Sequence, residues 1–303
     1  MKVDILGRHS LADCLARYDE WLATTRQFAE RSKREYRDNV SHLVEYLETR
    51  CGVRSATAVQ RQHLTGFLAH CAARGHAAST RRRSVAAIRS FFAFLVRERI
   101  LQDSPARLLL PPERETRPPR VLSEAEYQRL RAAATGHARD TALIELVLQT
   151  GLRLTEISQL ALHDVILPSI DSRVSLPIGH VRIAGRGRRS RVVTLNLRAC
   201  EALTEYLAAR EETGSPALFL TNFGKGIGPR GIENVVAKYC AEAGIVGASV
   251  HSLRHTIAVR TLAHGASPAI VAKALGHASP ETMGVYLGIA RDAMDAEMQR
   301  GEL

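Results

Sequence analysis

Three short segments in the second half of the chain carry side chains that can act together on an anionic substrate. They read TGLRLTE at 150–156, HSLRH at 251–255 and LGH at 275–277, and Tyr286 follows the last histidine by nine residues. A guanidinium donates paired hydrogen bonds to anionic oxygens, an imidazole titrates near neutral pH, and a tyrosine hydroxyl can serve as a nucleophile. The segments are much more specific together than any one of them alone.

This set of segments resembles the tyrosine recombinase (phage integrase) family, whose catalytic domain carries TGxRxxE, HxxRH and LGH segments followed by a nucleophilic tyrosine. Order and spacing both match, and the resemblance covers residues 113–303 through these motifs. It implies a site-specific DNA recombinase of the integrase, transposase or resolvase type. Such an enzyme cuts and rejoins DNA strands through a 3′-phosphotyrosyl intermediate, without a metal, ATP or another cofactor.

The resemblance carries specific roles onto matching positions of this chain. Tyr286 is expected to be the nucleophile, and Arg153 and Arg254 are expected to hold the two non-bridging phosphate oxygens. His251 and His277 are expected to add hydrogen bonds and to carry protons.

Two further residues of the motifs are expected to have lesser roles. Glu156 lies three residues after Arg153, and the resemblance implies that it orients active-site groups without contacting DNA. For His255, packing or a backbone hydrogen bond would explain the residue as well as a role in the active site would.

The turn at 185–191 departs from the family pattern, because it reads GRGRRSR where the family carries a catalytic lysine in a GKGxK-like turn. Arg186 occupies the lysine position, and an arginine is a poor acid because its pKa exceeds about 12. One hypothesis is that Arg186 stabilises the leaving oxygen while a histidine or water delivers the proton; the alternative is an impaired subunit. For Lys225, a loop or DNA-backbone role is favoured over a catalytic one.

Two other functions remain open at this stage. The chain could be a catalytically weakened DNA-binding accessory subunit of a recombination complex, which the missing lysine would explain. It could also be a type IB topoisomerase, although its short length, its LGH segment and its helical first third favour the recombinase.

Basic residues concentrate in the first third of the chain. Residues 1–112 carry 19 Lys and Arg against 11 Asp and Glu, within a chain of net charge +11. Neutralising phosphates is the main sequence-independent contribution to DNA affinity, so this excess favours a DNA-facing surface. The arginines expected to contact DNA are Arg81, Arg82, Arg83, Arg188 and Arg189.

Apolar residues recur at helical spacing through the first third, which predicts a four-helix bundle. Prolines between 104 and 120 interrupt regular structure. The spacing of Ser123 and Glu126 predicts a capping box at a new helix, and residues 181–184 and 191–195 predict a β-hairpin. We therefore expect a mainly α fold with a SAM-like helical core-binding domain at 1–103, a linker at 104–120, and a mixed α+β catalytic domain with a small antiparallel sheet at 121–303.

The remaining expectations concern environment and partners. The sequence lacks a signal peptide or a membrane-spanning apolar run, and its five cysteines have no metal-ligand spacing, so we expect reduced thiols, no metal site and a cytoplasmic, bacterial location. The expected partners are double-stranded DNA recombination sites and further copies of the chain, as a tetramer on DNA, with related recombinase subunits as another option. The tail after Tyr286 is expected to dock either on a neighbouring protomer or on its own domain.

Overall fold

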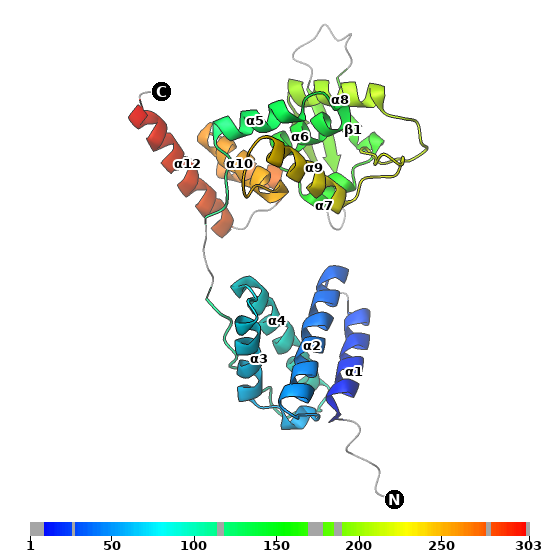
Figure 1. Ribbon diagram of the computed structural model, residues 1–303, viewed down its shortest axis with the longest axis vertical. Helices are drawn as coiled ribbons and strands as arrows, with labels where there is room; N and C mark the ends of the chain where they lie inside the picture. The colour runs from blue at the N-terminus through cyan, green and yellow to red at the C-terminus, as the bar shows by residue number, and fades with distance from the viewer. Residues whose placement is uncertain are drawn as a thin grey trace, which may run out of the picture. The chain divides into compact units, whose positions relative to one another are not determined.

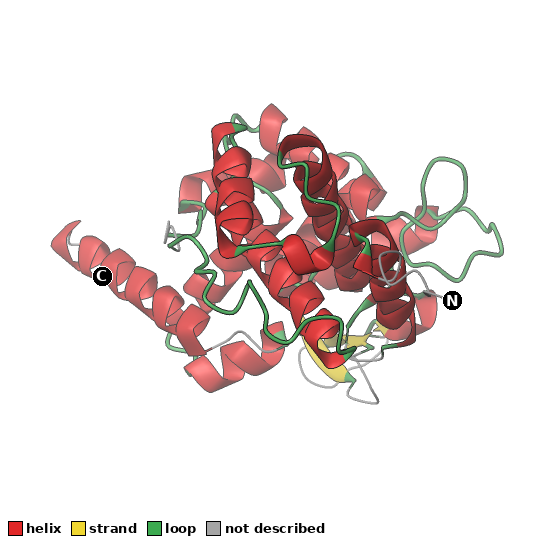
Figure 2. Cartoon of the chain, turned by 90° about the horizontal axis from the view of Figure 1, so that it is seen from below, coloured by secondary structure: helices red, strands yellow, loops and turns green. Residues whose placement is uncertain are grey.

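Two compact units make up the chain, Met1–Arg117 and Pro118–Leu303 (Figure 1). The computed structural model describes residues 9–25, 28–113, 118–168, 178–184, 190–276 and 280–300, the last five by backbone alone. In the described residues, helices dominate both units, and the strands form one small sheet in the second (Figure 2). This confirms the predicted mainly α fold.

The first unit is a bundle whose helices are α1 (Leu11–Thr24), α2 (Glu30–Arg50), α3 (Arg61–Ala73) and α4 (Ala78–Arg97), with a short 3-10 turn η2 (Ala56–Ala58). Ser10 begins α1 by accepting a hydrogen bond from the backbone N–H of Asp13. Tyr18 of α1 is fully buried against Phe91 of α4, and its hydroxyl donates to Ser90 at 2.8 Å. The apolar faces therefore meet inside the bundle, as their helical spacing predicts.

The proline-containing segment after α4 packs against this first unit. Ala106 and Leu109 are buried in the core of the bundle. Arg82 donates to the carbonyl of Pro112 at 2.6 Å, and Arg89 donates to the carbonyl of Leu109 at 2.7 Å. Residues 104–112, which fall in the predicted linker, are thus held on the helical bundle.

The second unit contains most of the elements. They are α5 (Glu124–Ala134), α6 (Ala138–Thr150), α7 (Leu154–Ser158), η3 (Leu162–Asp164), β1 (Val165–Ile166), β2 (Gly179–Ile183), β3 (Arg191–Leu195), α8 (Leu197–Ala209), α9 (Pro229–Glu242), α10 (Val250–Ala263), α11 (Pro268–Leu275) and α12 (Pro280–Arg300). Ser123 and Glu126 form the predicted capping box at α5. Ser249 caps α10 by accepting a hydrogen bond from the backbone N–H of Ser252.

The sheet is antiparallel with the order β1-β2-β3, and Val181 of β2 lies between Val165 and Val193. The β2–β3 pairing confirms the predicted hairpin. The sequence did not predict β1, because two residues are too few to show an alternating pattern.

The second unit buries its apolar side chains in two separate clusters. The larger joins α5, α6, α8 and α9 to the sheet. The smaller joins α10, α11 and α12, and it contains Tyr286 among residues such as Leu262, Val271 and Met283. The helix that carries Tyr286 is therefore attached through α10 and α11, and Figure 1 shows it beside α10.

Candidate active site

The end of α11 is the point at which residues from all three sequence segments meet. The last carbonyls of a helix have no partner within the helix and carry partial negative charge. Here arginines provide the partners: Arg254 of α10 donates to the carbonyl of Leu275 at 2.7 Å, and Arg153 donates to the carbonyl of Gly276. The structure thus brings together two of the predicted phosphate-binding side chains on one helix end.

Two glycines of the motifs make this close packing possible. Gly151 ends α6 at φ +57° and Gly276 ends α11 at φ +69°, conformations that a side chain disfavours. A Cβ atom on Gly151 would lie 2.5 Å from the side chain of Ile257. A Cβ atom on Gly276 would lie 3.1 Å from Nη1 of Arg153. Both positions therefore require glycine for shape as well as for backbone conformation.

Arg254 is the more deeply buried of the two arginines, with 8% of its surface exposed. Its guanidinium also donates to the carbonyl of Gly151 at 2.6 Å, which ties α10 to the end of α6. Burial, together with the positive charge of Arg153, lowers the pKa of Arg254 to about 10. The side chain remains protonated at neutral pH, so a fixed positive charge is held at the site.

Glu156, which the family resemblance predicts to orient active-site groups, contacts two arginines. Arg153 precedes the first turn of α7, and its backbone N–H donates to Glu156 at 2.8 Å while its Nη1 donates at 3.1 Å. Arg191 of β3 donates to both carboxylate oxygens of Glu156 at 2.9 Å. Burial alone would raise the pKa of Glu156, but these hydrogen bonds and charges hold it below its usual value.

The hydroxyl of Tyr286 is 2.7 Å from Nδ1 of His255. Tyr286 is 3% exposed, and burial raises its pKa although the charge of Arg254 opposes the rise. Burial, with the nearby His251 and Arg254, lowers the pKa of His255, so its ring is neutral at neutral pH. The ring of His255 lies between the other two, with its centroid 5.6 Å from that of His251 and 5.5 Å from that of Tyr286.

Sequence reasoning missed two residues of this site. Arg191 is the last residue of the basic turn at 185–191, and the hairpin pattern contains no signal that singles it out. His255 was expected to pack or to bind the backbone, but it contacts the hydroxyl of Tyr286. Both contacts join residues more than 30 positions apart, so only the tertiary structure reveals them.

Several predicted site residues lie outside the described residues: His277, Arg186, Arg188 and Arg189. Lys225 is described and lies far from the arginine pair. Arg139, near the start of α6, donates to Leu220 and Asn222 in the same turn as Lys225. The arginine pair lies at the other end of α6, about 18 Å away at 1.5 Å per helical residue. This separation favours a loop or DNA-backbone role for Lys225, as the sequence predicts.

Three of the five arginines predicted to contact DNA lie in the first turns of α4 and have different surroundings. Arg83 is exposed, Arg81 donates to the carbonyl of His76 at 3.2 Å, and Arg82 is held by Pro112.

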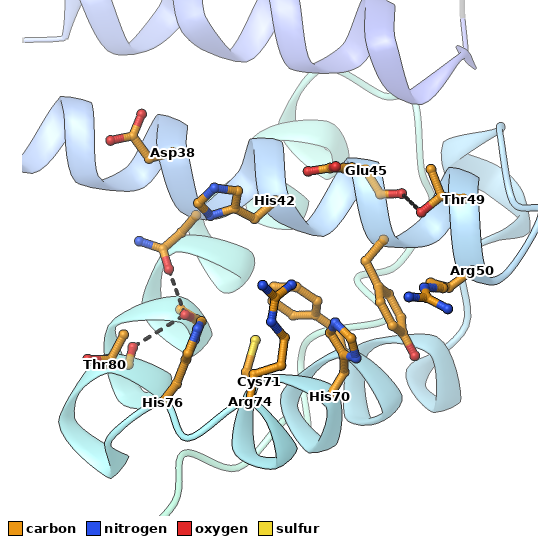
Figure 3. A pocket seen from close by; sticks show the side chains of 14 residues that line it. Asp38, His42, Glu45, Thr49, Arg50, His70, Cys71, Arg74, His76 and Thr80 are labelled. Atoms are coloured by element: carbon orange, nitrogen blue, oxygen red, sulfur yellow. Dashed lines mark hydrogen bonds between the residues drawn. The ribbon is translucent and has the colours of Figure 1, made fainter.

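An open cavity of about 600 Å³ lies between α2, α3 and the start of α4 (Figure 3). Its lining mixes basic and acidic side chains, which include His42, His70, His76, Arg50, Arg74, Asp38 and Glu45.

Comparison with known sequences decides the family. Residues 120–292 match the phage integrase family, and residues 15–99 match the N-terminal SAM-like domain of phage integrases. The chain belongs to the phage integrase family. It is a site-specific DNA recombinase, an enzyme that breaks and rejoins DNA, and this confirms the function that the motifs predict.

Relatives of this recombinase match it over nearly their whole length. Tyrosine recombinase XerC of Pelotomaculum thermopropionicum is 30% identical over 292 residues, which cover 90% of this chain and 92% of the relative. Tyrosine recombinase XerD of Oceanobacillus iheyensis is 27% identical over 281 residues, which cover 89% and 92%.

Solved structures share the fold. The XerH site-specific recombinase bound to a palindromic difH substrate, in a post-cleavage complex, gives a TM-score of 0.74 at 20% identity, and the match covers 95% of this chain and 85% of that one. A lambda integrase dimer bound to a COC′ core site gives 0.72 at 16% identity, covering 92% and 95%. Among the described residues, no helix of this recombinase is long and apolar enough to cross a membrane.

Proposed function

We propose that this recombinase cuts one DNA strand by attack of the Tyr286 hydroxyl oxygen on the scissile phosphorus. The new O–P bond makes a 3′-phosphotyrosyl link, and the bond from phosphorus to the 5′ oxygen breaks. The bond energy stays in the covalent link, so a 5′ hydroxyl from another strand can reverse the reaction without ATP. The observation that carries this proposal is the meeting of Tyr286, His255 and Arg254 beside the end of α11.

The phenolic proton passes to Nδ1 of His255 as the O–P bond forms. A neutral imidazole within hydrogen-bond distance is positioned to accept it. His255 meets both conditions, because it lies 2.7 Å from the Tyr286 hydroxyl and its pKa is held below the usual value. A buried phenol is a weak nucleophile until its proton leaves, so this transfer gives Tyr286 its reactivity.

Arg153 and Arg254 hold the two non-bridging phosphate oxygens, and His251 and His277 add hydrogen bonds. Both arginines already donate to carbonyls at the end of α11. Those contacts fix where the guanidinium groups lie before DNA arrives, which reduces the reorganisation needed in the transition state. The arginines keep donors for the phosphate, since a guanidinium carries five N–H groups.

Arg186 stands at the lysine position of the hairpin and stabilises the negative charge that develops on the departing 5′ oxygen. It does not deliver the proton, because a guanidinium has too high a pKa; a histidine or a water molecule does. This division of labour makes cleavage slower than a lysine-bearing hairpin would allow.

DNA is held by the basic side chains of both units, with Arg81, Arg82 and Arg83 on α4 and Arg188 and Arg189 in the hairpin turn. Four copies of the chain hold two duplexes, and two successive strand exchanges complete recombination. The reaction takes place in the bacterial cytoplasm.

The end of α12 docks on a neighbouring copy, which fits the exposure of residues 291–295. Deleting residues 290–303 should weaken assembly on DNA and leave monomer folding intact; unchanged assembly would reject the docking.

The experiment that tests the proposal is covalent capture. The protein is incubated with a library of nicked duplexes that contain a randomised central region, so that a cut releases a short fragment and traps the enzyme on DNA. We expect protein attached to the 3′ end of the recovered strands, and none with Tyr286→Phe. An absence of covalent product from the wild-type protein across the library would reject the proposal.

A further inference from the structure

The carboxylate of Glu156 is shared between two arginines. Arg191 donates through Nη1 and Nη2 to the two carboxylate oxygens, each at 2.9 Å, while Arg153 donates through its backbone N–H and its Nη1. The carboxylate thus accepts four hydrogen bonds, which matches its four lone-pair sites. One negative charge faces two positive charges, so the group of three keeps a net positive charge.

Arg191 also binds the end of α11. Its Nε donates to the carbonyl of Ala274 at 3.0 Å. Its guanidinium lies against Gly276, where an added Cβ atom would be 2.8 Å from Cζ. The side chain is 17% exposed. Successive carbonyls at the end of α11, those of Ala274, Leu275 and Gly276, therefore bind three different arginines.

We infer that Arg191 is a positioning residue for DNA cleavage: it neutralises Glu156 and so leaves the positive charge of Arg153 available to the scissile phosphate. This role rests on the proposed function of Arg153. Arg191 is also the first residue of β3, so the same contacts anchor the base of the hairpin whose turn carries Arg186.

The charges around Glu156 explain why Arg191 affects Arg153. With Arg191 in place, Glu156 prefers the bidentate partner, and Arg153 keeps most of its attraction for an anion. Without Arg191, the buried carboxylate has Arg153 as its remaining cationic partner in these contacts, and the two charges cancel. The guanidinium of Arg153 would then be drawn toward Glu156, and its attraction for the phosphate would fall. The hydrogen bonds and charges that lower the pKa of Glu156 keep the carboxylate ionised, so the competition persists at neutral pH.

A purely structural salt bridge predicts a different outcome. In that case, losing either Arg191 or Glu156 would weaken the fold, and losing both would cost at least as much as losing one. In the positioning role, the harm of losing Arg191 comes from the charge left on Glu156. Removing that charge as well should restore cleavage, which a structural role does not predict.

The test is a double-mutant cycle on the rate of single-turnover cleavage, with a nicked duplex recovered by the covalent capture described above and with protein in excess over DNA. We expect Arg191→Ala to slow cleavage by roughly tenfold or more, because it weakens a preorganised oxyanion donor. Arg191→Lys, which keeps the charge but not the bidentate geometry, should cleave faster than Arg191→Ala. Combining Arg191→Ala with Glu156→Gln should recover most of the loss.

Arg182→Ala supplies the matched control. Arg182 is an exposed arginine of the same sheet, on β2, and it lies opposite Val192, so the variant removes an equal charge without touching Glu156. Thermal unfolding of every variant separates slow cleavage from loss of fold.

The cleavage rates of these variants distinguish the positioning role from a structural bridge and from a failure of the proposed reaction. An unchanged rate for Arg191→Ala, with cleavage by the wild type intact, overturns the positioning role alone. A double variant as slow as or slower than Arg191→Ala also overturns it, in favour of a structural bridge. No cleavage by the wild type overturns the proposed reaction, and the role of Arg191 in it falls as well.

Discussion

Nδ1 of His255 lies 2.7 Å from the hydroxyl oxygen of Tyr286, and this contact joins α10 to α12. It makes His255, in addition to His251 and His277, a candidate for taking the phenolic proton. The contact also fixes the ring of Tyr286 within the small apolar cluster of α10, α11 and α12.

Replacing His255 by Ala should slow cleavage by about 10²-fold, the usual contribution of a general base. In the wild type, the rate should stay constant as the pH falls to the ordinary imidazole pKa and should fall only at lower pH, because burial lowers the pKa of His255 and protonation then removes the base. The variant should lose that acidic limb. Single-turnover rates across pH measure this, with His264→Ala, at the exposed end of α10, as the control. A variant that keeps both the wild-type rate and its limb would exclude His255 as the base.

Replacing Gly276 by Ala should both destabilise the second unit and slow cleavage. The added Cβ atom would lie 2.7 Å from Arg191 and 3.1 Å from Arg153, and φ is +69°. A loss of about 1–2 kcal/mol in the free energy of unfolding is expected for a side chain in this backbone region. Denaturant unfolding measures it. Gly288→Ala is the control, because a Cβ atom there meets nothing within 4 Å. Alanine also favours a helix more than glycine does. Equal stability of the two variants would contradict the steric argument.

Stability should depend on the ionisation of Glu156. Its pKa in the folded chain lies below the ordinary value of 4.5, so its stabilising contribution is complete above that value and is lost as the pH falls through the folded pKa. The difference in unfolding free energy between the wild type and Glu156→Gln should therefore be constant above the ordinary carboxyl pKa and shrink as the pH falls below it. Chemical denaturation at several pH values gives this difference. If it stays constant at low pH as well, the carboxylate does not stabilise the fold through its charge.

Replacing Arg81, Arg82 and Arg83 together by Ala should reduce the salt dependence of DNA binding. The slope of log affinity against log salt should fall by about one for each phosphate that the variant no longer neutralises. Arg82 is expected to add least, because its guanidinium is held by the carbonyl of Pro112. Titrations at several salt concentrations measure the slope, and Arg54→Ala, an exposed arginine after α2, is the control. An unchanged slope would show that these arginines do not bind phosphate.

Replacing Arg186 by Lys should accelerate cleavage, since a lysine supplies the acid that an arginine cannot. The measurement is the single-turnover rate on a nicked duplex, and Arg186→Ala shows what the positive charge alone contributes. Should the lysine variant be no faster than the wild type, the loss of an acid at this position would not limit the rate.

The sequence alone determined the features that depend on residue type and on spacing along the chain. The motif spacing indicated Tyr286, Arg153 and Arg254, and the family match confirms the recombinase that those motifs predict. Local rules found the capping box at Ser123 and the β2–β3 hairpin, since each depends on neighbours within a few residues. A sequence pattern can reveal such interactions because the interacting residues are close together in the chain.

Only the tertiary structure decided which side chains share a proton or a charge. The His255–Tyr286 contact spans 31 positions and the Arg191–Glu156 pair spans 35. Neither follows from a helical or strand period, because each depends on how α7, α10, α12 and β3 pack around the end of α11. The same packing places Lys225 at the far end of α6 from the arginine pair. The motifs pointed to the candidate residues, and the packing of these elements determined their partners.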